Sequence, residues 1–136
     1  MENSMPGKTA LGLDANVGAM VCYLANLLCG IGGIIYSILV ITQDKVNHLT
    51  RFHAFQSLFL SIAMIVLNVV LYIVMIVGIF IDAMLGFPII SGLMGLLMLV
   101  VSIAFLVFWI LAMVKAYGGQ IYKIPFIGDL AEKYAT

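Results

Sequence analysis

Polar and ionisable side chains gather at positions 51–57, where the chain reads Arg-Phe-His-Ala-Phe-Gln-Ser at the start of a long apolar run. Imidazole changes its charge near neutral pH, so His53 could act as a titratable gate. Arg51 could bind a lipid phosphate or cap a neighbouring helix. Other polar residues follow at steps of three or four, which is typical of one helix face. The candidate polar set is Arg51, His53, Gln56, Ser57, Ser61 and Asn68, together with Asn26 of the preceding apolar run.

Two interpretations of this polar set remain open. Polar groups in lipid normally turn toward the protein interior, where a hydrogen bond between helices contributes roughly 0.6 to 2 kcal/mol. On this interpretation the set holds helices together, and Asn26 could pair directly with Asn68. Alternatively, the set lines a polar pathway or crevice. The absence of a carboxylate within the apolar runs favours helix packing, because ion and proton paths commonly contain an ionisable group.

The sequence offers little to a catalytic or metal site. His48 and His53 are five residues apart and therefore face different sides of a helix, and Asp44 is the only other candidate ligand nearby. Cys22 and Cys29 are separated by about 10 Å of helical rise, too far for a disulfide. No catalytic triad order, phosphate-binding glycine loop or pair of catalytic carboxylates is found. We therefore expect no enzymatic activity, no cofactor and no metal.

The composition indicates a protein that resides in lipid. Of the 136 residues, 65% are hydrophobic and 9% are charged, and the mean hydropathy is +1.24. A soluble domain of this size could not bury so much apolar surface. Six basic residues balance six acidic ones, which argues against binding to nucleic acid.

Three apolar runs predict an all-α integral membrane protein with three transmembrane helices. The expected spans are 17–41, 54–81 and 88–114, each at least as long as the ~20 residues that cross a bilayer. The second and third are separated by Gly86-Phe87-Pro88, because proline disfavours helix at the residue before it and suits a first turn. Residues 1–16 are expected to form a polar tail without the features of a cleaved signal peptide.

Basic residues predict the orientation of these spans. Lys45 and Arg51 lie in the first loop, and Lys115, Lys123 and Lys133 lie at the C-terminal end. Three spans place both regions on one side, which the positive-inside rule assigns to the cytoplasm. The prediction is an N-terminus outside and a C-terminus in the cytoplasm of a prokaryotic inner or internal membrane.

Residues 116–136 are expected to form an interfacial tail. Tyrosine rings suit the headgroup region and lysines reach water, and the glycine pair after Tyr117 suits a helix end. Asp129 could cap a short helix over 130–134. The alternative is a peptide that docks a partner. The residues assigned to this segment are Tyr117, Tyr122, Lys123, Pro125 and Asp129.

Two motifs carry a family resemblance that covers the chain from about residue 16 onward. They are Arg-Phe-His-Ala-x-Gln-Ser at 51–57 and Tyr-x-x-Pro-x-Ile-Gly-Asp at 122–129. The chain resembles a widespread family of small prokaryotic membrane proteins of unassigned function. That family includes MamF-type magnetosome membrane proteins and is similar to the plastid inner-envelope translocon (Tic) channel component. The resemblance to the plastid component implies translocation, although that component is described with four spans.

The leading functional hypothesis is a non-enzymatic structural or assembly subunit of a membrane complex. Small residues at 25, 29, 33 and 37 and at 91, 92, 95 and 102 would let helices approach closely, within the chain or between chains. The expected partners are membrane lipid and other membrane-protein subunits or further copies of the chain. The alternatives are an oligomeric channel or translocation component, and a lipid-binding membrane protein.

Overall fold

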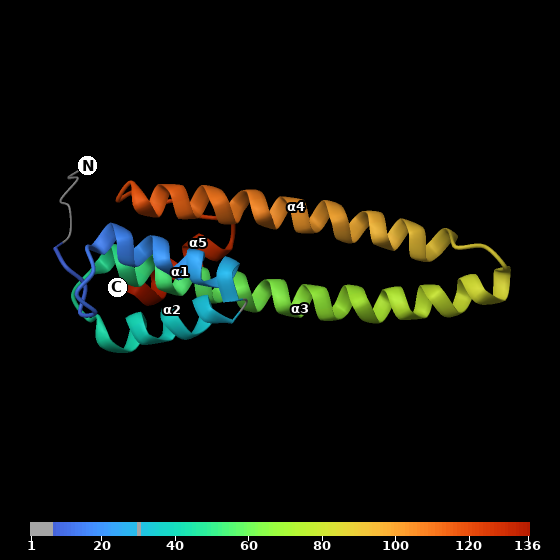
Figure 1. Cartoon of the computed structure of the whole chain (residues 1–136), viewed down its shortest axis with the longest axis horizontal. Coiled ribbons are helices and arrows are strands. Elements are labelled where there is room, and N and C mark those ends of the chain that lie inside the picture. Colours follow the sequence, from blue (N-terminus) through green and yellow to red (C-terminus); the bar gives the residue numbers. More distant parts are fainter. Residues whose placement is uncertain (1–6, 30) are drawn as a thin grey trace. The chain divides into compact units, whose positions relative to one another are not determined.

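The computed structural model describes residues 7–29 and 31–136, in which the regular elements are helices and one isolated bridge joins Lys8 to Asp14. The all-α class expected from the sequence is confirmed. In chain order the helices are α1 (Ala15–Cys29), α2 (Gly32–Gln43), α3 (His48–Leu85), α4 (Ile89–Tyr117) and α5 (Ile127–Ala135), as labelled in Figure 1.

The first predicted span, 17–41, is not a single helix, and this expectation is corrected. α1 has 15 residues and α2 has 12, so each is only about 18 to 22 Å long against a hydrocarbon core of about 30 Å. The two helices pack on each other through Gly33, which is buried. A Cβ at Gly33 would lie 2.6 Å from the carbonyl oxygen of Cys22 and would also overlap the amide of Asn26. Glycine is therefore required for this close approach.

The second and third predicted spans correspond to α3 and α4, the two described helices long and apolar enough to cross a membrane. The predicted break at 86–88 is confirmed, since α3 ends at Leu85, Gly86 has a φ of +82° and α4 begins at Ile89. Asp82 caps α4. Its two carboxylate oxygens accept hydrogen bonds from the backbone N–H groups of Ile90 (2.9 Å) and Ser91 (2.7 Å).

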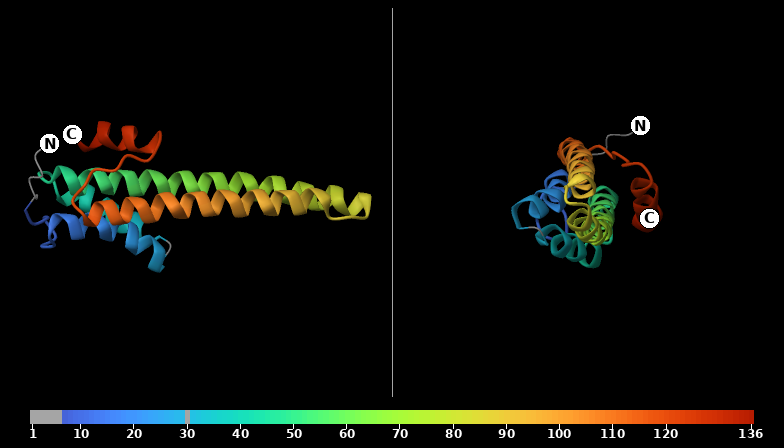
Figure 2. Two further views of the ribbon diagram at one scale, coloured as in Figure 1. Left: turned by 90° about the horizontal axis from the view of Figure 1, so that it is seen from above. Right: turned by 90° about the vertical axis from the view of Figure 1, so that its right-hand side faces the viewer.

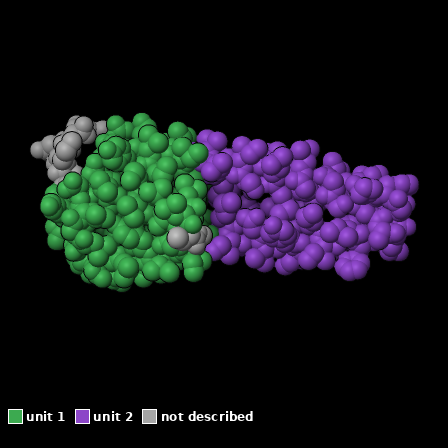
Figure 3. Space-filling view, viewed as in Figure 1, with its two compact units in different colours: residues 1–61, 108–136 green, residues 62–107 purple. Residues whose placement is uncertain are grey.

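The chain divides into two compact units, coloured separately in Figure 3. Unit 2, Ile62–Val107, holds the later part of α3, the turn and most of α4. Its large side chains are mostly half exposed, as expected for helices that face lipid, and Gly78 lets the two helices meet beside Ile90. Unit 1, Met1–Ser61 with Phe108–Thr136, contains α1, α2, the first turns of α3, the end of α4 and α5.

Within unit 1, α5 lies beside the first turns of α3 and runs in the opposite direction (Figure 2). Its buried side contributes Ala131 and Ala135 to a cluster with Phe52. The predicted helix over 130–134 exists, but it begins earlier, at Ile127. The N-cap position is occupied by Phe126 rather than Asp129, which lies in the first turn, so that capping prediction is wrong.

The N-terminal segment of unit 1 lies near the loop that precedes α3. The side-chain amide of Asn47 donates to the carbonyl oxygen of Gly7 (3.4 Å), and that of Asn16 donates to the carbonyl oxygen of Tyr117 (3.0 Å). Residues 1–6 of the predicted 1–16 tail lie outside the described residues. Because residue 7 sits beside the 44–47 loop, the expected placement of the N-terminal segment on the opposite side from that loop is not supported.

Candidate functional site

A buried hydrogen-bond network joins α1 and α3 to the segment after α4. The hydroxyl of Tyr23 lies 3.0 Å from Nδ1 of His53, and Nε2 of His53 lies 3.0 Å from the carbonyl oxygen of Gln120. A carbonyl oxygen only accepts, so Nε2 carries the proton in this arrangement. Nδ1 of the neutral ring then accepts from the Tyr23 hydroxyl. Both ring nitrogens of His53 are thus bound within the chain.

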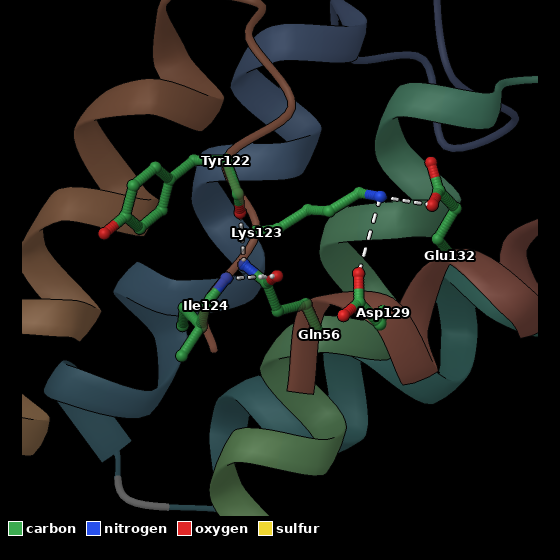
Figure 4. Close-up of polar contacts among 6 residues, drawn as sticks. All are labelled: Gln56, Tyr122, Lys123, Ile124, Asp129 and Glu132. Carbon is green, nitrogen blue, oxygen red and sulfur yellow. Dashed lines mark hydrogen bonds and ion pairs between the residues drawn. The ribbon is translucent and has the colours of Figure 1, made fainter. Parts of the chain in front are cut away.

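Gln56 clamps the same segment (Figure 4). Its Nε2 donates to the carbonyl oxygen of Tyr122 (2.9 Å). The same nitrogen donates to the Tyr23 hydroxyl (3.0 Å). Its Oε1 accepts from the backbone N–H of Ile124 (3.2 Å). The amide therefore binds one backbone carbonyl and one backbone N–H of the segment 122–124, the same pair of groups that a neighbouring β-strand would bind. Because Gln56 is fully buried, these bonds replace those that water would otherwise supply.

The serines and Asn26 of the predicted polar set hold α1, α2 and α3 together. Ser57 donates to the carbonyl oxygen of Cys22 (2.8 Å), and Asn26 donates to the hydroxyl of Ser61 (2.7 Å). Oδ1 of Asn26 accepts from the backbone N–H of Gly33 (3.1 Å). The expected pair of Asn26 with Asn68 is therefore wrong. Asn68 instead donates to the carbonyl oxygen of Met64 in its own helix (2.8 Å).

Arg51 connects the ends of two helices. One guanidinium nitrogen, Nη1, donates to the carbonyl oxygens of Ile41 (3.2 Å) and Asp44 (3.0 Å), at the end of α2. Nε donates to the carbonyl oxygen of Ala135, at the end of α5 (3.4 Å). The last carbonyls of a helix have no intrahelical partner and carry partial negative charge. Of the two roles considered for Arg51, the structure shows helix capping.

The predicted tail residues have different surroundings. Lys123 forms ion pairs with Glu132 and with Asp129 (3.5 Å), which connect the segment before α5 to α5 itself (Figure 4). The pKa of the Lys123 ammonium is raised above its ordinary value, chiefly because it donates a hydrogen bond to Glu132. The rings of Tyr117 and Pro125 are exposed, whereas Tyr122 is half buried. The contribution of Tyr122 to the network is its backbone carbonyl oxygen, which accepts from Gln56.

Two buried aromatic side chains of the network were not among the predicted site residues, and neither were Gln120 and Ile124, which take part through their backbone. Tyr23 is fully buried, and its ring meets those of His53 and Trp109 edge to face at centroid distances of 5.7 and 6.2 Å. The indole nitrogen of Trp109 donates to the carbonyl oxygen of Tyr23 (3.1 Å). A polar-tipped aromatic residue deep in an apolar run was the available signal, because such rings usually have a hydrogen-bond partner when buried.

The polar groups described above are bonded to other parts of the same chain. The side-chain polar atoms of Tyr23, His53 and Gln56 all have hydrogen-bond partners. The network therefore fixes one arrangement of α1, the first turns of α3 and residues 120–124. Across residues 7–29 and 31–136, no group of three or more His, Cys, Asp or Glu residues is placed to hold a metal ion. The arrangement is that of a structural core.

These features define a small all-helical membrane protein with a polar core that holds its C-terminal segment. A profile of the MamF/MmsF family, described as the magnetosome magnetite crystal formation protein family, matches residues 14–131. The chain belongs to this family. The family part of the resemblance stated above is thereby confirmed, while the link to the plastid translocon component stays a prediction.

Three relatives share the name UPF0132 membrane protein. The UPF0132 membrane protein MJ1443 of Methanocaldococcus jannaschii is 36% identical over 129 residues, covering 95% of this chain and 96% of the relative. A second protein of that organism, MJ1527, is 37% identical over 125 residues and covers 92% and 73%. One from Archaeoglobus fulgidus is 26% identical over 121 residues. No solved structure matches the chain.

Proposed function

We propose that the chain is a non-enzymatic integral membrane protein that serves as a structural or assembly subunit of a membrane complex. The observation that carries this proposal is the closed network around Gln56, whose amide hydrogen-bonds Tyr23, Tyr122 and Ile124. Such a network rigidifies a unit and specifies one arrangement. A rigid unit of this kind suits the display of a fixed surface to other subunits.

The proposed topology has two spans, α3 and α4, with the described N-terminal residues and the C-terminal segment on one side. All six basic residues belong to unit 1, and the sequence from 62 to 107 contains neither lysine nor arginine. The positive-inside rule then favours the cytoplasm for that side. This proposal keeps the expected cytoplasmic C-terminus and moves the N-terminal segment to the same side.

The proposed assembly contact involves Asn68. Its side chain is half buried and donates to Met64 of its own helix, and among the described residues no hydrogen bond to its Oδ1 is found. In hydrocarbon, an asparagine amide favours contact with a polar group on another helix. Asn68 therefore supports association of α3 with a helix of another subunit.

A pathway lined by the polar set is the less supported alternative. Its members His53, Gln56 and Ser57 are fully buried and hydrogen-bonded within the chain. A pathway through them would require those bonds to open.

The proposal is tested by extracting the protein from its own membrane in native lipid discs, weighing the particles and identifying what accompanies them. We expect a complex of defined composition. Asn68→Leu should reduce the fraction in that complex, whereas Val69→Leu, at the neighbouring exposed position, should leave it unchanged. Recovery of the wild-type chain alone would contradict the subunit role, and a closed homo-oligomer with measurable conductance would favour the pathway.

A further inference from the structure

The turn before α5 holds a phenylalanine in a strained conformation. Phe126 has φ +66° and ψ −46°, and the N–H of Ile127 donates to the carbonyl oxygen of Pro125 across it (2.8 Å). This is a γ-turn with positive φ, a rare and strained form. Glycine would adopt it with less strain, because it has no Cβ. The Phe126 side chain does not compensate through packing, since the residue is 91% exposed.

Contacts within unit 1 show which residues of α3 lie beside this turn. The carbonyl oxygen of Ala135, at the end of α5, is held by Arg51, and the ring of Tyr134 meets that of Phe59. Because α5 runs opposite to α3, its first residue lies toward the apolar end of this part of α3 (Figure 2). Ile124, just before the turn, is bound to Gln56.

The level of Gln56 and Phe59 can be compared with the expected edge of the hydrocarbon. Asp82 is the last charged residue of α3, and about 20 helical residues cross the hydrocarbon core, so the opposite edge falls near residue 62. Gln56 is about 9 Å of helical rise from that edge. Apolar side chains at this depth reach the boundary between headgroups and acyl chains.

A second group of exposed apolar side chains follows Asn26, near the same part of α3. Asn26 is hydrogen-bonded to Ser61, so the end of α1 that follows Asn26 is near this part of α3. Leu28 is 74% exposed and Ile31 is 64% exposed. Large apolar side chains exposed to water favour aggregation. In a family of membrane proteins, contact with the bilayer explains their exposure.

We propose that the γ-turn at 125–127 inserts Phe126 into the lipid boundary on the side of the membrane where unit 1 lies. Leu28 and Ile31 enter the same boundary from another part of unit 1, so that unit 1 is seated in the bilayer surface. Tyr134 and Leu130, which are partly exposed on α5, extend the apolar contact from Phe126. The occupant of this surface is lipid, and the inference is independent of the assembly role proposed above.

The test uses the full chain in vesicles of phosphatidylcholine and phosphatidylglycerol, with Cys22 and Cys29 replaced by alanine. A spin label is attached at Phe126→Cys, and its relaxation by oxygen, which dissolves in lipid, is compared with relaxation by a water-soluble nickel chelate. Lys133→Cys, on the exposed side of α5, is the water control, and Val100→Cys, half exposed on α4, is the lipid control.

We expect the label at 126 to respond to oxygen at least threefold more than the label at 133 and to be shielded from nickel. Nickel access equal to that at 133 would overturn the inference, as would shielding from both reagents, which indicates a protein contact. If the labelled variant loses helix content, Phe126→Trp in a Trp109→Phe background replaces it. Its fluorescence should then be quenched by brominated acyl chains, and quenching by acrylamide alone would overturn the inference.

Discussion

The hydroxyl of Tyr23 and Nδ1 of His53 lie 3.0 Å apart, although 30 positions separate the two residues in the chain. The contact joins α1 to α3, and the other nitrogen of the same ring reaches Gln120 after α4. Three segments that are distant in sequence therefore depend on one tyrosine and one histidine. A buried network of this kind is costly when one member is removed, because the remaining groups lose their partners.

Replacing Tyr23 with phenylalanine should lower the free energy of unfolding by about 1–3 kcal/mol, the usual cost of an unsatisfied buried polar group. The substitution keeps the ring and leaves Nδ1 of His53 without its donor. Thermal or denaturant unfolding in mild detergent measures the effect. Tyr117→Phe, at an exposed ring, is the matched control and should be neutral. Equal stability of both variants would show that the hydroxyl contributes nothing.

Replacing Gln56 with leucine should release residues 120–124 while α1 and α2 stay folded. The change leaves the N–H of Ile124 and the carbonyl oxygen of Tyr122 without their partners. Amide hydrogen exchange at Ile124 should become at least tenfold faster, which corresponds to about 1.4 kcal/mol. Gln43→Leu, at an exposed position near the end of α2, should change nothing. Unchanged exchange at Ile124 would refute the clamp.

Adding one methyl group at Gly33 should separate α1 from α2. A Cβ there lies 2.6 Å from the carbonyl oxygen of Cys22, so Gly33→Ala should destabilise the chain by about 1–3 kcal/mol through overpacking. At Gly92 a Cβ meets nothing within 4 Å, and Gly92→Ala should be neutral or slightly stabilising. Unfolding midpoints of the two variants in the same detergent provide the comparison. Equal midpoints would argue for a single continuous helix over 17–41.

The ammonium of Lys123 should titrate above the ordinary lysine range. Its pKa is raised because it donates a hydrogen bond to Glu132. A raised lysine pKa means that the pair's stabilisation is fully present below the ordinary lysine value, about 10.4, and is lost as pH rises through the raised value. Side-chain carbon NMR can follow the titration of Lys123. Glu132→Gln should move the Lys123 midpoint down, and an unmoved midpoint would exclude the pairing with Glu132.

The sequence was sufficient for the helical class and for much of the polar set. Apolar runs around 54–81 and 88–114 predicted α3 and α4, because length and the absence of charge are local properties. The break at Gly86-Phe87-Pro88 was also predictable from local backbone chemistry. Arg51, Gln56 and Ser57 stood out because polar groups next to an apolar run require partners.

The first apolar run was misread because its length concealed a break. Glycines at 30, 32 and 33 each lower helix stability by about 1 kcal/mol relative to alanine, and together they were the available signal. Hydropathy does not respond to glycine spacing, so the run resembled one span. The partners of Asn26 depend on the fold-back of α2 onto α1, and no local pattern specifies them.

The conformation of residue 126 could not be predicted either. The sequence Pro125-Phe126-Ile127 contains no glycine or asparagine, the residues that most often adopt a positive φ. It follows from tertiary contacts, since Gln56 fixes residues 122 and 124 while Phe52 and Arg51 hold α5. Local preferences yield to such contacts when the surroundings determine the backbone.

Labelling from the two sides of the membrane tests the two-span topology most directly. Single cysteines replacing Lys8 and Lys133, in a background with Cys22 and Cys29 changed to alanine, are reacted with a membrane-impermeant thiol reagent in intact cells and in inverted vesicles. The two-span topology predicts that both positions react only in inverted vesicles. The contacts of Asn47 with Gly7 and of Arg51 with Ala135 place them on one side. Reaction of position 8 in intact cells with position 133 protected would contradict it and restore three spans.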